Sequence, residues 1–236
     1  MKDYGKSMET KINKKSIVYP DLQNSFLEKD AYLKLKDFLQ NHFDSKEIVK
    51  KEDIVDMDTF KDVYIDNRVG RAVCTIDSDN IDKSIISPFI EYAKSFNPDA
   101  ILDFISYVVY DNQYGFPQLV PHYDRPSNVC FLLDYQVDSN TSWDLVVDGA
   151  PYSMSDNDMI TMNVTSQIHW RDPKVFLDGE YVKVIFFSFI DKDLDVYNIK
   201  RSPSEIDKSF SMYKMACESA YPEEYKNVYK KLITLW

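Results

Sequence analysis

The chain has 236 residues, a mass of 27.7 kDa and a formal net charge of −11. This length suits one large domain or two small ones, and a hydrophobic fraction of 44% supplies enough apolar surface for a core, which excludes wholesale disorder. The acidic charge makes nucleic acid a disfavoured partner, because it would repel a phosphate backbone.

Residues 1–20 are polar and rich in lysine, and they predict an arm that lies over the domain or leaves it. They lack the apolar run of a secretory leader, and no stretch of the chain has the apolar length that would span a membrane. The three cysteines form no CxxC pair, and an odd number without a leader indicates free thiols in a reducing compartment. We therefore expect a cytoplasmic protein without a membrane partner.

Two helices and one strand are predicted in the N-terminal part of the chain. Residues 24–43 carry apolar side chains at near-helical spacing and predict an amphipathic helix, with His42 at its end. The charged stretch 45–60 is typical of a loop. Residues 71–76 predict a strand, and residues 87–96 predict a second helix that stops before an Asn-Pro pair.

From Ala100 the pattern changes to short β-branched and aromatic runs separated by Asp, Asn, Ser, Gly and Pro. This rhythm over about residues 100–191 is typical of a β-sandwich or barrel. Residues 202–236 return to helical spacing, with a break at Pro222. The chain is therefore predicted to be mainly β with flanking helices. We expect one integrated domain with three parts: an arm, helices and strand over 1–99, a β core over 100–195 and a helical extension over 196–236.

The sequence PHYDRPS places His122 two positions before Asp124. Side chains alternate in an extended segment, so His122 and Asp124 are expected on one face and Tyr123 on the other. His169 follows at the end of another predicted strand, in SQIHW. Two imidazoles and one carboxylate on the wall of a β-barrel form the facial triad that binds Fe(II) and leaves three octahedral positions open.

A His-x-Asp pair in an acidic chain is, by itself, more typical of a turn or a surface ion pair. Three other features favour a metal site here: the β-rich setting, the downstream histidine, and a cation on or just before the final strand. The acidic runs 77–82 and 191–196 lack the glycine and the glutamate of a calcium loop, so we expect them to be solvated turns.

The β-rich region resembles the 2-oxoglutarate- and Fe(II)-dependent oxygenases, in the prolyl-hydroxylase-like branch, whose core is a double-stranded β-helix (jelly roll). The resemblance covers about residues 104–190 and lies in YDNQYGFPQLVPHYDRPSNVCFLLDYQ, WDLVVDGAPYSMSDNDMITMN and SQIHWRDPKVFLDGEYVKVIFFSF. It implies that His122, Asp124 and His169 bind Fe(II). It further implies that the chain uses 2-oxoglutarate and O2, releases succinate and CO2, and hydroxylates a small molecule or a protein side chain.

The sequence departs from that family at two motifs. The family's Gly-Gly is absent, with Ser142-Trp143 in its neighbourhood, and the usual arginine with Ser or Thr two residues later is replaced by Lys183-Val184-Ile185. By family position, Lys183 is the first candidate for the cation that holds the far carboxylate of 2-oxoglutarate. Both faces of this last strand are apolar, so periodicity leaves open which face lines the barrel.

Two arginines close to the metal ligands are the next candidates for this cation. Arg171 follows His169 by two residues, and Arg125 follows Asp124 directly. Tyr110 lies where relatives often place a tyrosine that donates a hydrogen bond to the cosubstrate, although core packing explains it equally well. Trp170 is expected to pack in the core.

Two alternatives to an oxygenase stay open. A cupin-type jelly roll that binds metal without 2-oxoglutarate is expected to offer three or four histidines, often with a glutamate, whereas this region offers two histidines and an aspartate. A decayed, non-catalytic binding module should have lost ligands, yet all three are present. The net charge favours a cationic or neutral substrate. The sequence leaves the substrate and the oligomeric state open.

Overall fold

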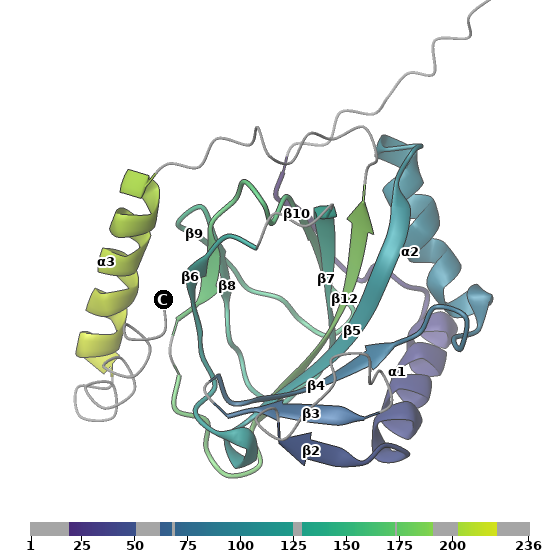
Figure 1. Cartoon of the computed structure of the whole chain (residues 1–236), viewed down its shortest axis with the longest axis horizontal. Coiled ribbons are helices and arrows are strands. Elements are labelled where there is room, and N and C mark those ends of the chain that lie inside the picture. Colours follow the sequence, from purple (N-terminus) through teal and green to yellow (C-terminus); the bar gives the residue numbers. More distant parts are fainter. Residues whose placement is uncertain are drawn as a thin grey trace, which may run out of the picture.

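A computed structural model describes residues 19–50, 62–67, 69–124, 129–172, 174–190 and 203–220. In these residues two β-sheets face each other, with helices on their outer faces (Figure 1). The eight-stranded sheet has the order β1-β10-β7-β12-β5-β4-β3-β2, and the four-stranded sheet has the order β6-β11-β8-β9. The larger sheet consists of β1 (Asp21–Gln23), β2 (Ile48–Lys50), β3 (Val63–Asp66), β4 (Arg71–Ile76), β5 (Ile101–Asp111), β7 (Val129–Ser139), β10 (Met159–Met162) and β12 (Tyr181–Ile190). The smaller sheet consists of β6 (Leu119–His122), β8 (Leu145–Val147), β9 (Ala150–Tyr152) and β11 (His169–Arg171).

The strands from β5 to β12 pass back and forth between the two sheets. Strands β5, β7, β10 and β12 lie in the larger sheet, and β6, β8, β9 and β11 form the smaller one. Their pairings within each sheet are antiparallel. This interleaving is the double-stranded β-helix, and it confirms the predicted fold class, mainly β with flanking helices.

Helices α1 (Lys29–Asp44) and α2 (Lys83–Phe96) cover the outer face of the larger sheet, and α3 (Pro203–Ala220) covers the smaller sheet beside β6 (Figure 1). Helix α2 begins four residues before the predicted start, because Asp82 caps it by accepting a hydrogen bond from the backbone N–H of Ser84. His42 lies in the last turn of α1, as predicted. These helices pack on apolar residues of the outward faces of the two sheets.

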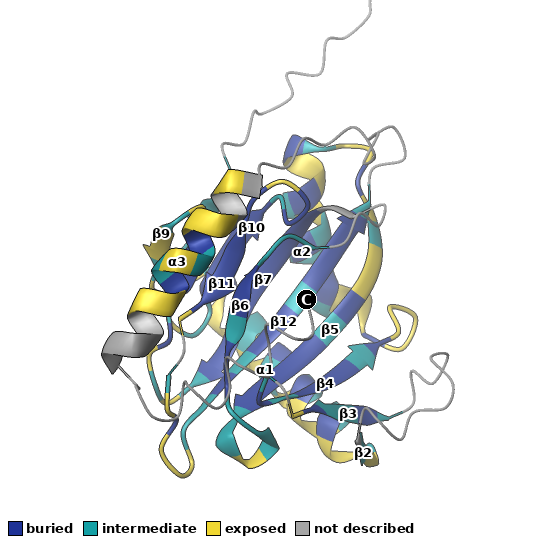
Figure 2. Ribbon diagram, turned by 60° about the vertical axis from the view of Figure 1, so that its left-hand side comes forward, coloured by how far each residue is buried: buried dark blue, intermediate teal, exposed yellow. Residues whose placement is uncertain are grey.

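Alternation along β12 separates the core under the helices from the space between the sheets. Ile185, Phe187 and Phe189 are fully buried in the cluster under α1 and α2, and Lys183 is on the same face, with its Nζ 2.9 Å from Gln40 of α1. The opposite face consists of Val182, Val184, Phe186 and Ser188, which pack between the sheets or line the cavity there. Figure 2 shows the resulting band of buried strands. The face of β12 that lines the inside of the barrel is therefore the one with Val182, Val184, Phe186 and Ser188.

The larger sheet extends beyond the predicted β core. The strand predicted over 71–76 is β4, which pairs with β5. The stretch 45–60 was predicted as a loop, but three of its residues form strand β2, so the prediction was wrong there. These residues pair with β3, and the local sequence does not show this pairing. The predicted arm up to residue 18, the acidic run 191–196 and the break at Pro222 lie outside the described residues. Among the helices described, none is both long and apolar enough to cross a membrane.

Candidate metal centre and its cavity

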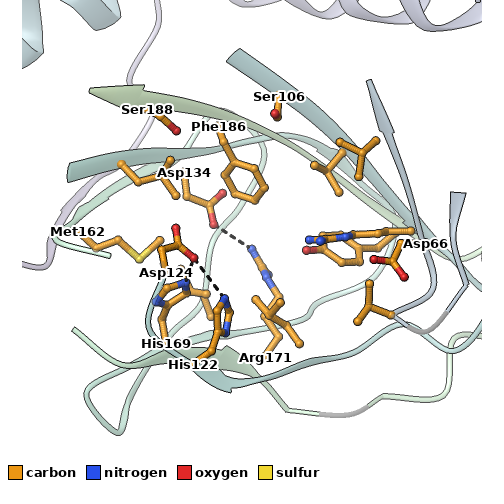
Figure 3. Close-up of a pocket in the computed structure, with 18 of the residues that line it drawn as sticks. Asp66, Ser106, His122, Asp124, Asp134, Met162, His169, Arg171, Phe186 and Ser188 are labelled. Atoms are coloured by element: carbon orange, nitrogen blue, oxygen red, sulfur yellow. Dashed lines mark ion pairs between the residues drawn. The ribbon is translucent and has the colours of Figure 1, made fainter. Parts of the chain in front are cut away.

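The fold brings His122, Asp124 and His169 together, with one ligand atom of each within 4.8 Å of the others. His122 ends β6 and His169 begins β11, where the two residues are direct partners in the antiparallel ladder. Both Nε2 atoms face Oδ1 of Asp124, at 3.4 Å from His122 and 3.8 Å from His169 (Figure 3). The three predicted ligands therefore converge on one point.

Hydrogen bonds to the backbone orient both imidazole rings. Nδ1 of His122 lies 2.7 Å from the carbonyl oxygen of Val120, and Nδ1 of His169 lies 3.2 Å from that of Gln167. A carbonyl oxygen only accepts, so each Nδ1 carries the proton and each Nε2 keeps its lone pair for a metal. Burial and the neighbouring His122 lower the pKa of His169 to about 4, against the opposing effect of Asp124, so this ring is neutral at pH 7.

Asp124 supplies the anionic ligand of the set. Burial acts to raise the pKa of Asp124, but the hydrogen bond with His122 and the charges of the two histidines outweigh it, and the pKa is lowered. Its side chain is 40% exposed, compared with 6% for His169, so the centre is open to solvent on the Asp124 side. Two imidazoles and one carboxylate with an open side fit Fe(II) as a facial triad.

The hairpin turn between β8 and β9 positions His169, and it was not among the predicted site features. Asp148 and Gly149 connect β8 to β9 with φ angles of 51° and 85°, the left-handed pair that a two-residue turn requires. The Asp148 carboxylate accepts hydrogen bonds from the backbone N–H of Ile168 at 3.1 Å and from the side chain of Gln167 at 2.8 Å. Asp148 therefore fixes the two residues before the ligand. The Asp-Gly pair between two apolar runs was the available signal.

A cavity of about 520 Å³ lies between the sheets beside the three ligands. Its size falls in the range of sites for small molecules. Its other charged lining residues are Asp66, Arg71, Asp134 and Arg171. Tyr110 also lines it and packs edge-on against Trp143, with ring centroids 5.0 Å apart.

Arg171 reaches into this cavity from β11 and is 1% exposed. Its Nη1 donates to the carbonyl oxygen of Trp143, and its Nη2 lies 3.6 Å from Oδ2 of Asp134, a buried carboxylate on β7 (Figure 3). Among the described residues, neither this Nη2 nor Oδ1 of Asp134 has a hydrogen-bond partner. Burial raises the pKa of Asp134 to about 6, although Arg171 opposes the rise. Asp134 was not among the predicted site residues; its signal in the sequence was a charge within the apolar run NVCFLLDYQV.

The other predicted site residues lie in different places. Lys183 is outside the cavity, with its Nζ 3.8 Å from Asp138 on the helix-covered face of the sheet. This placement argues against Lys183 as the cosubstrate anchor, because β12 turns its opposite face to the cavity. Arg125 lies outside the described residues. Trp170 is buried with Tyr213 under α3, which confirms its predicted role in packing.

No protein-family model matches the sequence, and no curated protein matches it. Solved structures do resemble it. A prolyl-4-hydroxylase from Pseudomonas putida superposes with a TM-score of 0.54 at 11% identity, covering 73% of this chain and 92% of that one. The chain has the double-stranded β-helix fold of this enzyme.

Two further structures support the same fold. A prolyl hydroxylase from Trichoplax adhaerens, in complex with a peptide fragment of hypoxia inducible factor, gives a TM-score of 0.53 at 12% identity, covering 77% of this chain and 87% of that one. SnoN, a non-heme α-ketoglutarate-dependent epimerase from nogalamycin biosynthesis, gives 0.56 at 7% identity, with 73% and 78% covered. At these identities the likeness establishes the fold alone.

Proposed function

We propose that this chain is an Fe(II)- and 2-oxoglutarate-dependent oxygenase. The observation that carries the proposal is the placement of three convergent metal ligands and one buried arginine, Arg171, on the same cavity. The fold shared with two prolyl hydroxylases and an α-ketoglutarate-dependent epimerase agrees with it.

The residues of the chain have distinct roles in this proposal. His122, Asp124 and His169 would hold the iron, each through an atom that the structure already directs to one point. Bound Fe(II) would supply the oxidising chemistry in which 2-oxoglutarate and O2 give succinate and CO2 while a substrate C–H bond is hydroxylated. The protein excludes water from one side of the centre, because His169 and the strand that carries it are buried.

Arg171, rather than Lys183, is our candidate for the cation that pairs with the far carboxylate of 2-oxoglutarate. It is the cation nearest in sequence to His169, it extends into the cavity, and its guanidinium can bind a carboxylate through two parallel hydrogen bonds. The carbonyl oxygen of Trp143 holds one arm of this guanidinium. Tyr110, which lines the same cavity, is a further candidate for contact with the cosubstrate.

The substrate would reach the iron from the Asp124 side, where the centre is exposed. We propose a small molecule or a protein side chain as the substrate. The open side accepts either, and the Trichoplax structure holds a peptide fragment whereas SnoN is named for nogalamycin biosynthesis.

One observation favours a second candidate, a metal centre that does not take 2-oxoglutarate. Asp134 already stands beside Arg171 and offsets its charge. A cosubstrate carboxylate would have to share this guanidinium with Asp134. Titration of the iron-loaded protein with 2-oxoglutarate separates the two candidates.

Oxygen-free titration tests the proposal. Fe(II) should bind first, and 2-oxoglutarate should then bind with a weak visible charge-transfer band, followed by succinate release when O2 and a substrate panel are added. Asp124→Ala should abolish the band, whereas His42→Ala, at the histidine outside the ligand group, should leave it unchanged. Full iron loading without 2-oxoglutarate binding at any pH would favour the second candidate, and no iron binding would end both.

A further inference from the structure

The cavity holds a second carboxylate at the place where an anionic cosubstrate needs a cation. Asp134 and Arg171 are each 2% exposed in their side chains, and they meet across the cavity from β7 of one sheet and β11 of the other. Both line the cavity that also holds the three metal ligands. Any carboxylate that binds Arg171 there will therefore stand close to Asp134.

Arg171 and Asp134 form an ion pair without a direct hydrogen bond between Nη2 and Oδ2. Its N···O distance of 3.6 Å exceeds hydrogen-bond length, and the described residues give no hydrogen-bond partner to Arg171 Nη2 or Asp134 Oδ1. A guanidinium has donors for two acceptors, so Arg171 could bind an incoming carboxylate without losing Asp134. Two buried carboxylates at one guanidinium repel each other unless a proton lies between them.

We propose that Asp134 makes the binding of a carboxylate at Arg171 dependent on one proton, which is taken up from solvent and shared between Asp134 and the far carboxylate of 2-oxoglutarate. This inference rests on the proposed function. A protonated Asp134 donates a hydrogen bond to the incoming carboxylate, whereas an ionised Asp134 repels it. Asp134 is then a specificity-determining residue that ties cosubstrate affinity to pH.

The surroundings of Asp134 agree with this role. Burial raises its pKa to about 6, so that the residue is ionised at pH 7 and gains its proton at modest cost. The titratable groups on the same cavity are Tyr64, Asp66, Arg71, Tyr110, His122, Tyr123, Asp124, His169 and Arg171. Among the residues described, Arg171 is the ion-pair partner found for Asp134. Ser188 of β12 lines the cavity as well, and its Oγ has no partner in the described chain, so it can serve the same ligand.

Calorimetry on the full chain, loaded with Fe(II) and free of oxygen, tests the inference. The ligands are 2-oxoglutarate and pyruvate, which has the same keto-acid end but lacks the far carboxylate. Above about pH 6 the wild-type affinity for 2-oxoglutarate should fall about tenfold for each pH unit relative to the affinity for pyruvate. In Asp134→Asn, which mimics the neutral acid, this extra slope should vanish and binding at about pH 8 should be on the order of a hundredfold tighter than in the wild type.

A matched variant and a second measurement complete the design. Asp138→Asn alters another buried acid of β7, one that bonds Lys36 outside the cavity, and it should keep the wild-type slope. Titrations of the wild type in buffers of different ionisation enthalpy should show nearly one more proton taken up with 2-oxoglutarate than with pyruvate at about pH 7.5. This measurement needs no variant to fold.

The outcomes are distinguishable. Equal slopes in wild type and Asp134→Asn, or equal proton uptake with both ligands, would overturn the role of Asp134 and leave the oxygenase proposal standing. If iron loads but neither protein binds 2-oxoglutarate at any pH, the proposed function itself falls.

Discussion

His122 and His169 lie directly opposite each other on β6 and β11, and each ring is held by the carbonyl oxygen two residues before it. Their ring centroids are 4.3 Å apart. Because each accepting carbonyl belongs to the same chain segment as the ring, the backbone that carries each ligand also orients it. Both Nε2 atoms are therefore presented to Asp124 before any metal binds.

Replacement of any one metal ligand should weaken Fe(II) binding by more than about 100-fold, since loss of a ligand should exceed the effect of losing an outer hydrogen bond. The variants are His122→Ala, Asp124→Ala and His169→Ala, and the measurement is an oxygen-free competition with a chelator. His42→Ala is the matched control, because His42 stacks on Phe38 of α1 and is not part of the ligand group. Unchanged affinity in all three ligand variants would refute the metal centre.

Arg171 and Lys183 can be compared directly as anchors of 2-oxoglutarate. Arg171→Met should weaken binding on the order of a hundredfold, because a buried charge pair is lost. Arg171→Lys should recover only part of the affinity, since a lysine offers a point charge in place of a fork. Lys183→Met, on the helix-covered face, should change the affinity by less than about threefold. The reverse ranking would return the anchor to Lys183.

Asp148 should act on the metal centre without touching it. Asp148→Ala removes two hydrogen bonds that fix Gln167 and Ile168, and it should lower the free energy of unfolding by about 1–2 kcal/mol. Fe(II) affinity should fall about 10-fold, as for other groups that orient a ligand. Asp144→Ala, which loses the hydrogen bond from Ser153 near the same hairpin, is the control and should keep full affinity. Equal affinities in the two variants would show that Asp148 supports the fold alone.

Asp134 should also affect the pH dependence of stability. Its pKa rises from 3.8 to about 6 on folding, so the folded state holds the proton more tightly than the unfolded state. The resulting stability is fully present below about pH 4 and is lost as the pH rises to about 6, by up to about 3 kcal/mol. Asp134→Asn lacks this titration, so the free energy of unfolding of the wild type should fall relative to the variant across that window.

Urea unfolding of the metal-free proteins at a series of pH values measures this difference. The unpaired Arg171 of the variant adds an offset that does not depend on pH, and His169 titrates in both proteins. Asp138→Asn should follow the wild type. Parallel curves for wild type and Asp134→Asn would contradict the raised pKa.

The sequence predicted the parts of this structure that local patterns determine. The β4 strand has its predicted bounds, because RAVCTI lies between Gly70 and Asp77, and the three candidate metal ligands lie together as predicted. Strands β1, β2 and β3 are only three or four residues long and were not predicted. Strand β1 pairs with β10, which is remote in sequence. Local sequence does not contain that information.

The positions of the charged side chains in the cavity were harder to predict than the convergence of the two histidines and Asp124. Both faces of β12 are apolar, so its side-chain period could not show that Lys183 faces the helices. Asp134 sits among buried apolar neighbours on β7, and only the closure of one sheet over the other brings it to Arg171. An ion pair between two sheets depends on the tertiary fold, which alternation along one strand does not encode.

The last strand of the core, β12, is inserted between β5 and β7 in the middle of the larger sheet. During synthesis the ribosome must therefore release the chain through Ile190 before either of these neighbours can complete its hydrogen bonding. Until then two long strands have open edges that can pair with other chains. Folding should be slow, since its decisive contacts join residues far apart in sequence. Any chain that stops before Tyr181 should aggregate rather than fold into a smaller domain.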